Sequence, residues 1–477
     1  MIALYDYQDS LTVAVRRAFQ AGYRAPLLVL PTGAGKTVCF TWMAEQAQAR
    51  GKRVLILVHR KELVSQTSAA LALWGVAHGI ISGSAKPSRH PVQVAMVQTL
   101  ANRVALDKTG RFRFDLIIID EAHHATLNSG WAKVLAHNPK AKLLGVTATP
   151  VRLDGKGLGI EAQGFFDVLI CGPSAADLVA RGRLVRSVVY APAQSLDLSM
   201  VASRGGDYVT AQLAAAVDKA AITGDAVAHY KRYAADLAAI AFTITVAHGG
   251  HVVEQFKQAG IAAALLTGAT PAKERAQLIK DLGAGQLKVL ASCNVVSEGT
   301  DIPKVAAALL LRPTASYGLA MQQIGRALRT APGKDKAIIL DHAGNVLRHG
   351  LPTDEVEWSL QGMARPHAKG AALVKACKGC GALLSVKASS CLDCHVVCPA
   401  VAPRDELVSV ADGELVELTA EQLASLKAQK RQALIKARTK EQLVSLGRER
   451  NYQYPALWAD KIIAGRMSYR AQQEQRT

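Results

Sequence analysis

A glycine-rich turn near the amino terminus has the residue types that bind phosphate groups. Pro31-Thr32-Gly33-Ala34-Gly35-Lys36-Thr37 follows a short apolar run, 27–30, that predicts a buried strand. Backbone N–H groups of such a turn, and the N-terminus of the helix after it, favour a bound anion. Lys36 is expected to reach the β- and γ-phosphates of ATP, and the Thr37 hydroxyl to bind Mg²⁺. The general P-loop has glycine six residues before its lysine, where this chain has Leu30.

Two carboxylates follow another apolar run, 116–119, in the order Asp120-Glu121-Ala122-His123. A carboxylate at the C-terminal end of a strand, next to a phosphate-binding turn, is suited to hold Mg²⁺. We expect Asp120 to bind the metal and Glu121 to orient and deprotonate the attacking water. The plainer interpretation is an acidic surface turn. Thr147-Ala148-Thr149-Pro150 follows a further strand and offers hydroxyls that could hydrogen-bond His123.

A group of polar and cationic side chains lies much later in the chain. Gln322, Arg326 and Arg329 are spaced by four and three residues, which predicts one face of a helix. A planar guanidinium from a second domain would stabilise charge on the γ-phosphate and make hydrolysis depend on domain closure. In an isolated helix, solvated arginines are the commoner case. In the turn 297–303, Asp301 could contact the ribose or the arginine helix, and Thr300 a nucleic-acid phosphate.

Four of the eight cysteines have the spacing CxxC–x10–CxxC. Two such pairs close a tetrahedral thiolate site for structural Zn²⁺. Neighbouring His395 and Cys398 could replace one ligand, and a redox dithiol or free thiols are the alternatives. The four predicted zinc ligands are Cys377, Cys380, Cys391 and Cys394.

Composition limits the class of protein. The formal net charge of +19 over 477 residues favours a polyanionic partner such as nucleic acid, although a basic surface can also be merely solvated. No apolar run approaches the length of a membrane span, and the first residues lack the layout of a signal peptide. We therefore expect a cytoplasmic protein without membrane contact, in a reducing compartment.

Apolar runs of four to seven residues alternate with helical patterns in two blocks. This alternation predicts the α/β class, with parallel sheets covered by helices on both faces. The pattern weakens between about 187 and 225, where one domain is expected to end. The predicted division is 1–188 for the first domain, 189–362 for the second, 363–402 for the zinc segment and 403–477 for a mainly helical, basic C-terminal domain.

In their order, these motifs resemble the superfamily-two helicases and translocases of the DEAH type, and more closely the branch that contains XPB and type III restriction (ResIII) subunits. The resemblance runs from about residue 4 to about 360. It rests on the motifs above and on 58–66, 96–100, 148–159 and 341–350. It implies two tandem RecA-like domains around an ATP cleft, a zinc ribbon, and Arg326 and Arg329 as fingers on the γ-phosphate.

The resemblance also assigns binding residues. It implies that His59, Arg60, Gln98 and Thr99, together with Thr300, hold a nucleic-acid backbone, and that Gln8 reads the adenine base. Tyr5 or Tyr23 would offer a stacking surface for the base. Relatives usually have arginine three residues before that glutamine, where this chain has Tyr5.

The C-terminal segment has two interpretations. Its basic residues and aromatic residues could grip a forked nucleic acid, or the aromatics could form the core of a small helical domain. Together the patterns predict an ATP-dependent DNA helicase or translocase. The alternatives are an RNA helicase, or a zinc-ribbon DNA-binding adaptor with a vestigial ATPase. A protein partner that binds the zinc ribbon or the tail is left open.

Overall fold

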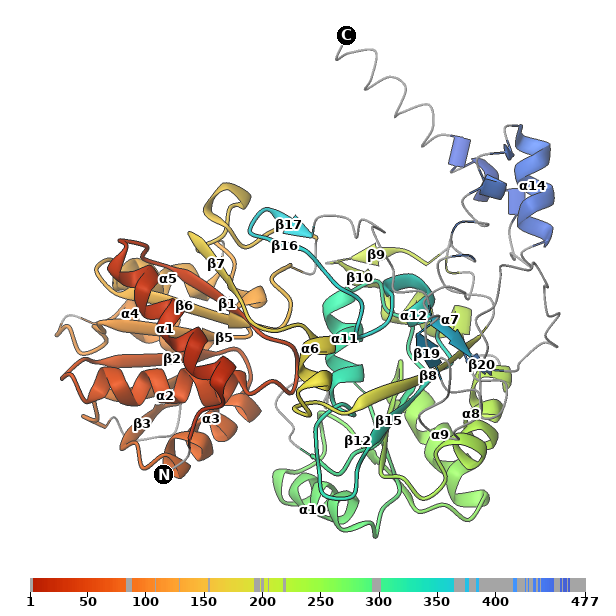
Figure 1. The fold of residues 1–477 in the computed structure, drawn as a ribbon, viewed down its shortest axis with the longest axis horizontal. Coiled ribbons are helices and arrows are strands. Elements are labelled where there is room, and N and C mark those ends of the chain that lie inside the picture. The colour runs from red at the N-terminus through yellow and green to blue at the C-terminus, as the bar shows by residue number, and fades with distance from the viewer. Residues whose placement is uncertain are drawn as a thin grey trace.

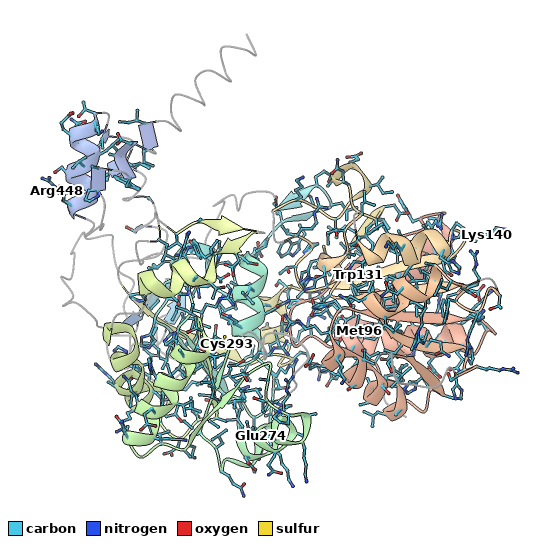
Figure 2. The ribbon with its side chains drawn as sticks, turned by 180° about the vertical axis from the view of Figure 1, so that it is seen from behind. Met96, Trp131, Lys140, Glu274, Cys293 and Arg448 are labelled. Carbon is cyan, nitrogen blue, oxygen red and sulfur yellow. The ribbon has the colours of Figure 1, made fainter. Side chains whose placement is uncertain are left out.

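Two seven-stranded sheets, each covered by helices on both faces, organise the chain (Figure 1). They form two lobes, which Figure 2 shows filled with side chains, with Met96 and Trp131 in the first lobe and Glu274 and Cys293 in the second. This computed structural model describes residues 3–82, 88–107, 109–127, 129–152, 155–192, 198, 201–204, 206–217, 220–293, 302–363, 374–376, 383–385, 415–417, and parts of 425–463.

The first sheet has the strand order β3-β4-β2-β5-β6-β1-β7, and all its strand pairs are parallel. Its residues alternate in direction, as the strand period requires: Leu28 and Ile118 belong to one core cluster, and Leu27 and Ile117 to the other. The strands are β1 (Pro26–Val29), β2 (Val54–Val58), β3 (His78–Ile81), β4 (Val92–Met96), β5 (Leu116–Asp120), β6 (Lys142–Thr147) and β7 (Val168–Cys171).

Helices cover both faces of the first sheet. Buried side chains of α1, α2 and α3 pack on one face, and those of α4 and α5 on the other. The elements are α1 (Asp6–Gln20), α2 (Lys36–Gln48), α3 (Lys61–Leu73), α4 (Val97–Val104) and α5 (Gly130–His137), with the short 3₁₀ helices η1 (Ala122–His124) and η2 (Ile160–Ala162).

The second sheet has the order β12-β13-β11-β14-β15-β8-β20. Its strands pair in parallel except β20, which lies antiparallel to β8. β20 comes from the segment 403–477, for which the sequence predicts a mainly helical domain. The strands are β8 (Arg186–Pro192), β11 (Ala239–Phe242), β12 (Ala263–Leu266), β13 (Val289–Ser292), β14 (Ala307–Leu310), β15 (Lys336–Asp341) and β20 (Leu415–Glu417).

The helices of the second lobe again occupy both faces. Those on one face, α8 and α9, pack on one core cluster, whereas α10, α11 and α12 pack on the other. The prediction of two tandem parallel-sheet α/β domains is confirmed. The helices are α8 (Ala220–Tyr233), α9 (Val246–Gln258), α10 (Ala272–Ala284), α11 (Tyr317–Gly325) and α12 (Asn345–His349).

Two chain segments connect the lobes. The first runs through α6 (Ala175–Ala180) into β8, a strand of the second sheet that spans the predicted boundary at residue 188. The second is the hairpin of β16 (Trp358–Ser359) and β17 (Gly362–Met363), which returns to the first lobe beside β7 (Figure 1). There the Gly159 N–H donates to the Leu360 carbonyl at 2.8 Å. The lobes are therefore joined by two chain segments, one through α6 and one through this hairpin.

The remaining described elements are short, apart from α14. Part of the segment 403–477, predicted to be mainly helical, is described, and α14 lies within it. Trp458 is 8% exposed and packs with Leu443 in a small cluster of its own, which favours the helical-core interpretation for this aromatic. The elements are α7 (Thr210–Val217), β9 (Ser203–Arg204), β10 (Asp207–Tyr208), β18 (Val374–Ala376), β19 (Leu383–Ser385) and α14 (Lys440–Glu449).

Within the described part of the chain, no helix combines the length and the apolar character needed to cross a membrane.

Candidate active site between the lobes

The glycine-rich turn lies between β1 and α2, at the C-terminal edge of the first sheet. Leu30 donates its N–H to the Thr147 carbonyl, 3.0 Å away, which extends the strand pairing to the turn. Gly33 and Gly35 have φ values of +89° and +83°, in the left-handed region that glycine adopts readily. α2 begins at Lys36 and is 13 residues long. Its first N–H groups have no acceptor inside the helix, so the turn and helix end together suit an anionic phosphate.

α1 packs against this turn through two side chains. The Tyr7 hydroxyl and the Gln8 amide both donate to the Ala34 carbonyl, at 2.9 and 3.3 Å. Burial raises the pKa of Tyr7 to about 12, so its hydroxyl keeps its proton at neutral pH. Gln8 also accepts the Tyr5 N–H at 3.0 Å. At Gly35, a Cβ atom would lie 2.3 Å from the Gln8 amide nitrogen. These contacts make Gln8 a support of the turn, and its recognition of adenine stays a prediction.

Asp120 and Glu121 lie at the end of β5, at the same edge of the sheet. Both are buried, with 6% and 8% exposed, and the Asp120 carboxylate accepts the Glu121 N–H at 2.9 Å. Glu121 has a φ of +50°, which strains a residue other than glycine. Its conformation is therefore maintained by the residues packed around it. In the sheet order, only β6 separates these carboxylates from the strand that carries the turn.

The predicted hydrogen bond between His123 and the threonine segment is confirmed, because His123 Nδ1 lies 3.0 Å from Thr147 Oγ1. Thr147 donates its one hydroxyl proton to the Thr149 carbonyl at 3.0 Å. His123 Nδ1 must therefore be the donor in its contact with Thr147. The same nitrogen lies 3.4 Å from a carboxylate oxygen of Glu121. His123 thus connects the threonine segment to Glu121.

The second lobe brings two arginines to the turn. α11 ends against it: a Cβ atom on Gly325 would lie 2.6 Å from Thr32 Cβ. A Cβ atom on Gly33 would lie 2.9 Å from Leu184 Cδ2 and 3.3 Å from Arg329 Cγ, so glycine suits this close approach as well as its φ value. Arg326 follows α11 directly and is 6% exposed. The two lobes therefore meet at the glycine-rich turn.

Lys36 responds electrostatically to charges from both lobes. Loss of solvation lowers its pKa; Glu121 and Asp120 oppose this shift, and Arg326 and Arg329 add to it. The Lys36 ammonium also lies 3.4 Å from the Leu30 carbonyl. One lysine, two carboxylates and two arginines from distant parts of the chain therefore share one site. An excess of positive charge at this site would stabilise a bound triphosphate.

The prediction that Gln322, Arg326 and Arg329 lie on one helical face is wrong, because only Gln322 lies in α11; Arg326 is the residue after the helix, at its C-cap. α11 ends at Gly325, and Arg329 forms an isolated β-bridge with Leu184 instead. The Val185 N–H donates to the Leu328 carbonyl at 2.9 Å. Pairing with the segment that connects the lobes therefore takes the chain out of the helix. Gln322 lies in α11 and is buried.

The predicted nucleic-acid residues lie along the same sheet edge, further from the turn. His59 and Arg60 follow β2, and Gln98 and Thr99 lie in the first turn of α4, directly after β4. β2 and β4 are parallel neighbours, so these four residues come from adjacent loops. Gln98 is exposed and the other three are half-buried. Thr300, Asp301 and the cysteines at 377, 380, 391 and 394 lie outside the described residues.

Family models and relatives match most of this structure. The model for "Type III restriction enzyme, res subunit" (ResIII) matches residues 1–152, and the model for "Helicase conserved C-terminal domain" matches residues 227–331. A "51.5 kDa protein" of a Lactococcus phage (isolate 7-9) is 30% identical over 390 residues, which cover 81% of each chain. The chain belongs to the superfamily-two helicases of the ResIII type.

This helicase has further relatives. It is 31% identical over 363 residues to the "Putative ATP-dependent helicase IRC3" of Saccharomyces cerevisiae, covering 72% of this chain but only 51% of that protein. Its fold is similar to a solved structure titled "ATP-dependent Type ISP restriction-modification enzyme LlaBIII bound to DNA", with a TM-score of 0.53, 19% identity, and coverage of 73% and 30% of the two chains. These matches identify an ATP-hydrolysing enzyme with two RecA-like lobes.

Several contacts between the lobes of this helicase have no signal in the sequence. The Arg275 guanidinium of α10 donates to the Glu62 carboxylate of α3 at 2.6 Å. Burial alone would raise the pKa of Glu62, but hydrogen bonds and the nearby arginine lower it. A cavity of about 200 Å³ lies between the lobes, lined by Thr32 of the turn, Tyr317 of α11 and Trp358 of the hairpin, among others. The residues are far apart in sequence, so only the packed fold brings them together.

Proposed function

We propose that this helicase is an ATP-dependent DNA helicase or translocase whose ATP site is completed by closure of the two lobes. The observation that best supports the proposal is the position of Arg326 and Arg329 at the turn that carries Lys36. Because the cations and the turn belong to different lobes, a bound triphosphate would be stabilised only when the lobes meet. Hydrolysis would remove that stabilisation and let the lobes separate.

In this proposal each residue has a defined task. Residues 32–37 bind the phosphates, and Asp120 and Thr37 hold Mg²⁺, for which a carboxylate and a hydroxyl are fitting oxygen ligands. When bound, the metal neutralises charge on the phosphates. Glu121 accepts a proton from the attacking water, and the two guanidinium groups stabilise the charge that develops on the γ-phosphoryl group. Gln322, in α11, contacts the γ-phosphate, and Asp301 contacts the ribose.

The nucleic acid is held by His59, Arg60, Gln98 and Thr99 of the first lobe and by Thr300 of the second. Contacts to the nucleic-acid backbone do not depend on the bases, so the enzyme would move along nucleic acid of any sequence. The formal net charge of +19 favours a polyanion. DNA is proposed over RNA because the resembling branch acts on DNA and because the type ISP enzyme of similar fold is titled as bound to DNA.

Stimulation of ATP hydrolysis by different nucleic acids tests this proposal. We expect single-stranded or duplex DNA to raise kcat by roughly tenfold or more over the protein alone, and RNA of equal length and sequence to raise it less. A Lys36→Ala protein should bind DNA as the wild type does but hydrolyse no ATP. Stronger stimulation by RNA would favour the RNA helicase. Absence of hydrolysis with every nucleic acid would favour the DNA-binding adaptor.

The zinc ribbon is also part of the proposal. It is supported by the CxxC–x10–CxxC spacing alone, since its cysteines lie outside the described residues. Elemental analysis of the purified chain should find one zinc per molecule. A Cys377→Ser, Cys380→Ser variant should lose it, whereas a matched Cys171→Ser variant should retain it. A wild-type protein that holds no zinc after purification without chelators would contradict this assignment.

A further inference from the structure

Three tilted imidazole rings contact one another in turn at the C-terminal edge of the first sheet, and we name this group the histidine stack. The ring centroid of His124 lies 4.0 Å from that of His59 and 4.2 Å from that of His123. The planes are tilted by 41° in both pairs. His59 follows β2, and the other two lie in η1 after β5; β2 and β5 are parallel neighbours, which brings the two loops together.

One end of this histidine stack reaches the carboxylate proposed as the general base. His123 is 6% exposed, and its Nδ1 is 3.0 Å from Thr147 Oγ1 and 3.4 Å from the Glu121 carboxylate. Glu121 has a strained backbone with φ of +50° that surrounding residues must maintain. A displacement of His123 would therefore displace or release the Glu121 carboxylate.

The other end of the histidine stack reaches the segment proposed to hold nucleic acid. His59 directly precedes Arg60, the residue that caps α3. His59 and His124 are both half-buried. A nucleic-acid strand that binds the loop after β2 and shifts His59 would therefore also shift the His124 ring that packs against it. No cluster of three or more metal-ligating side chains is found among the residues that the structure describes.

We propose that His124 is a positioning residue that couples nucleic-acid binding at His59 and Arg60 to the orientation of Glu121. This inference rests on the proposed function, because it requires nucleic acid at the loop after β2. The His124 ring touches both other rings, so its removal should weaken the connection while leaving His59 and His123 in place. Contiguous packed side chains of this kind are a physical route for coupling two sites.

Substitutions at His124 test the proposal through the stimulated and unstimulated rates. His124→Ala should leave the ATPase rate without nucleic acid within about twofold of the wild type and lower the rate at saturating DNA by roughly tenfold. His124→Phe keeps a flat ring and should restore at least half of the stimulation. His90→Ala, at an exposed histidine of the same lobe, is the matched control. DNA affinity, measured by fluorescence anisotropy, should change little in all three variants.

Three results would overturn this coupling. They are an equal loss of the unstimulated rate in His124→Ala, a loss of DNA affinity in place of stimulation, and full stimulation of the alanine variant. If His124→Ala fails to fold, the phenylalanine variant decides, since a stacked ring should preserve coupling. If no nucleic acid stimulates the wild type, the proposed function itself is rejected. If the wild type is stimulated but the His124 variants give one of the results above, only the coupling is rejected.

Discussion

A Glu121→Gln protein is expected to hydrolyse ATP about a thousandfold more slowly than the wild type while still binding it. Glutamine has the size of glutamate but cannot accept a proton from the attacking water. Glu121 is buried, and its N–H donates to the Asp120 carboxylate, so the exchange should leave the backbone arrangement intact. The loss should therefore appear in kcat, with KM for ATP changed much less.

Steady-state ATPase rates at saturating DNA and equilibrium ATP binding measure this effect. The matched control is Glu274→Gln, at an exposed glutamate on α10 of the second lobe (Figure 2). It should behave like the wild type. A loss of kcat below about tenfold in the Glu121 variant would be too small for a general base and would remove Glu121 from that role.

An Arg326→Ala protein is expected to lose about a thousandfold or more in kcat, the range seen when an arginine finger is removed. Arg326 is 6% exposed, and its charge helps to lower the pKa of Lys36. Its guanidinium would lie where charge develops on the transferred phosphoryl group, so its removal raises the barrier rather than weakening ground-state binding. Arg326→Lys should recover little, because an ammonium cannot reproduce a planar fork.

Single-turnover hydrolysis separates chemistry from product release for this variant. Lys280→Ala, at an exposed cation of the same lobe, is the control and should match the wild type. Circular dichroism should show that the Arg326 variants remain folded, since a buried arginine also contributes to packing. Unchanged single-turnover rates would show that the second lobe contributes nothing essential to catalysis through this residue.

Much of the fold follows from local patterns. The apolar runs at 54–58 and 289–291 predict strands because they are short and apolar throughout, and β2 and β13 are found there. The apolar run 240–246 also predicts a strand, but in the structure β11 ends at Phe242. Thr245 caps α9 by accepting the His248 N–H at 3.0 Å, so its side chain ends the extended segment.

The glycine-rich turn and the two carboxylates could also be found from sequence, since each is a contiguous motif whose spacing reflects its own backbone geometry. What sequence could not supply are contacts between distant segments. The end of α11 depends on pairing with Leu184, the Arg275–Glu62 ion pair joins residues 213 positions apart, and the histidine stack joins two loops. None of these contacts has a local pattern that would predict it.

The affinity for ADP–aluminium fluoride, an analogue of the phosphoryl group in transfer, tests the completion of the ATP site by the second lobe most directly. An Arg326→Ala, Arg329→Ala protein should bind this complex at least about a hundredfold more weakly than the wild type, with nearly unchanged affinity for ADP alone. Equal affinity of the two proteins for the analogue would contradict the account, because the arginines would then make no contact that strengthens during hydrolysis.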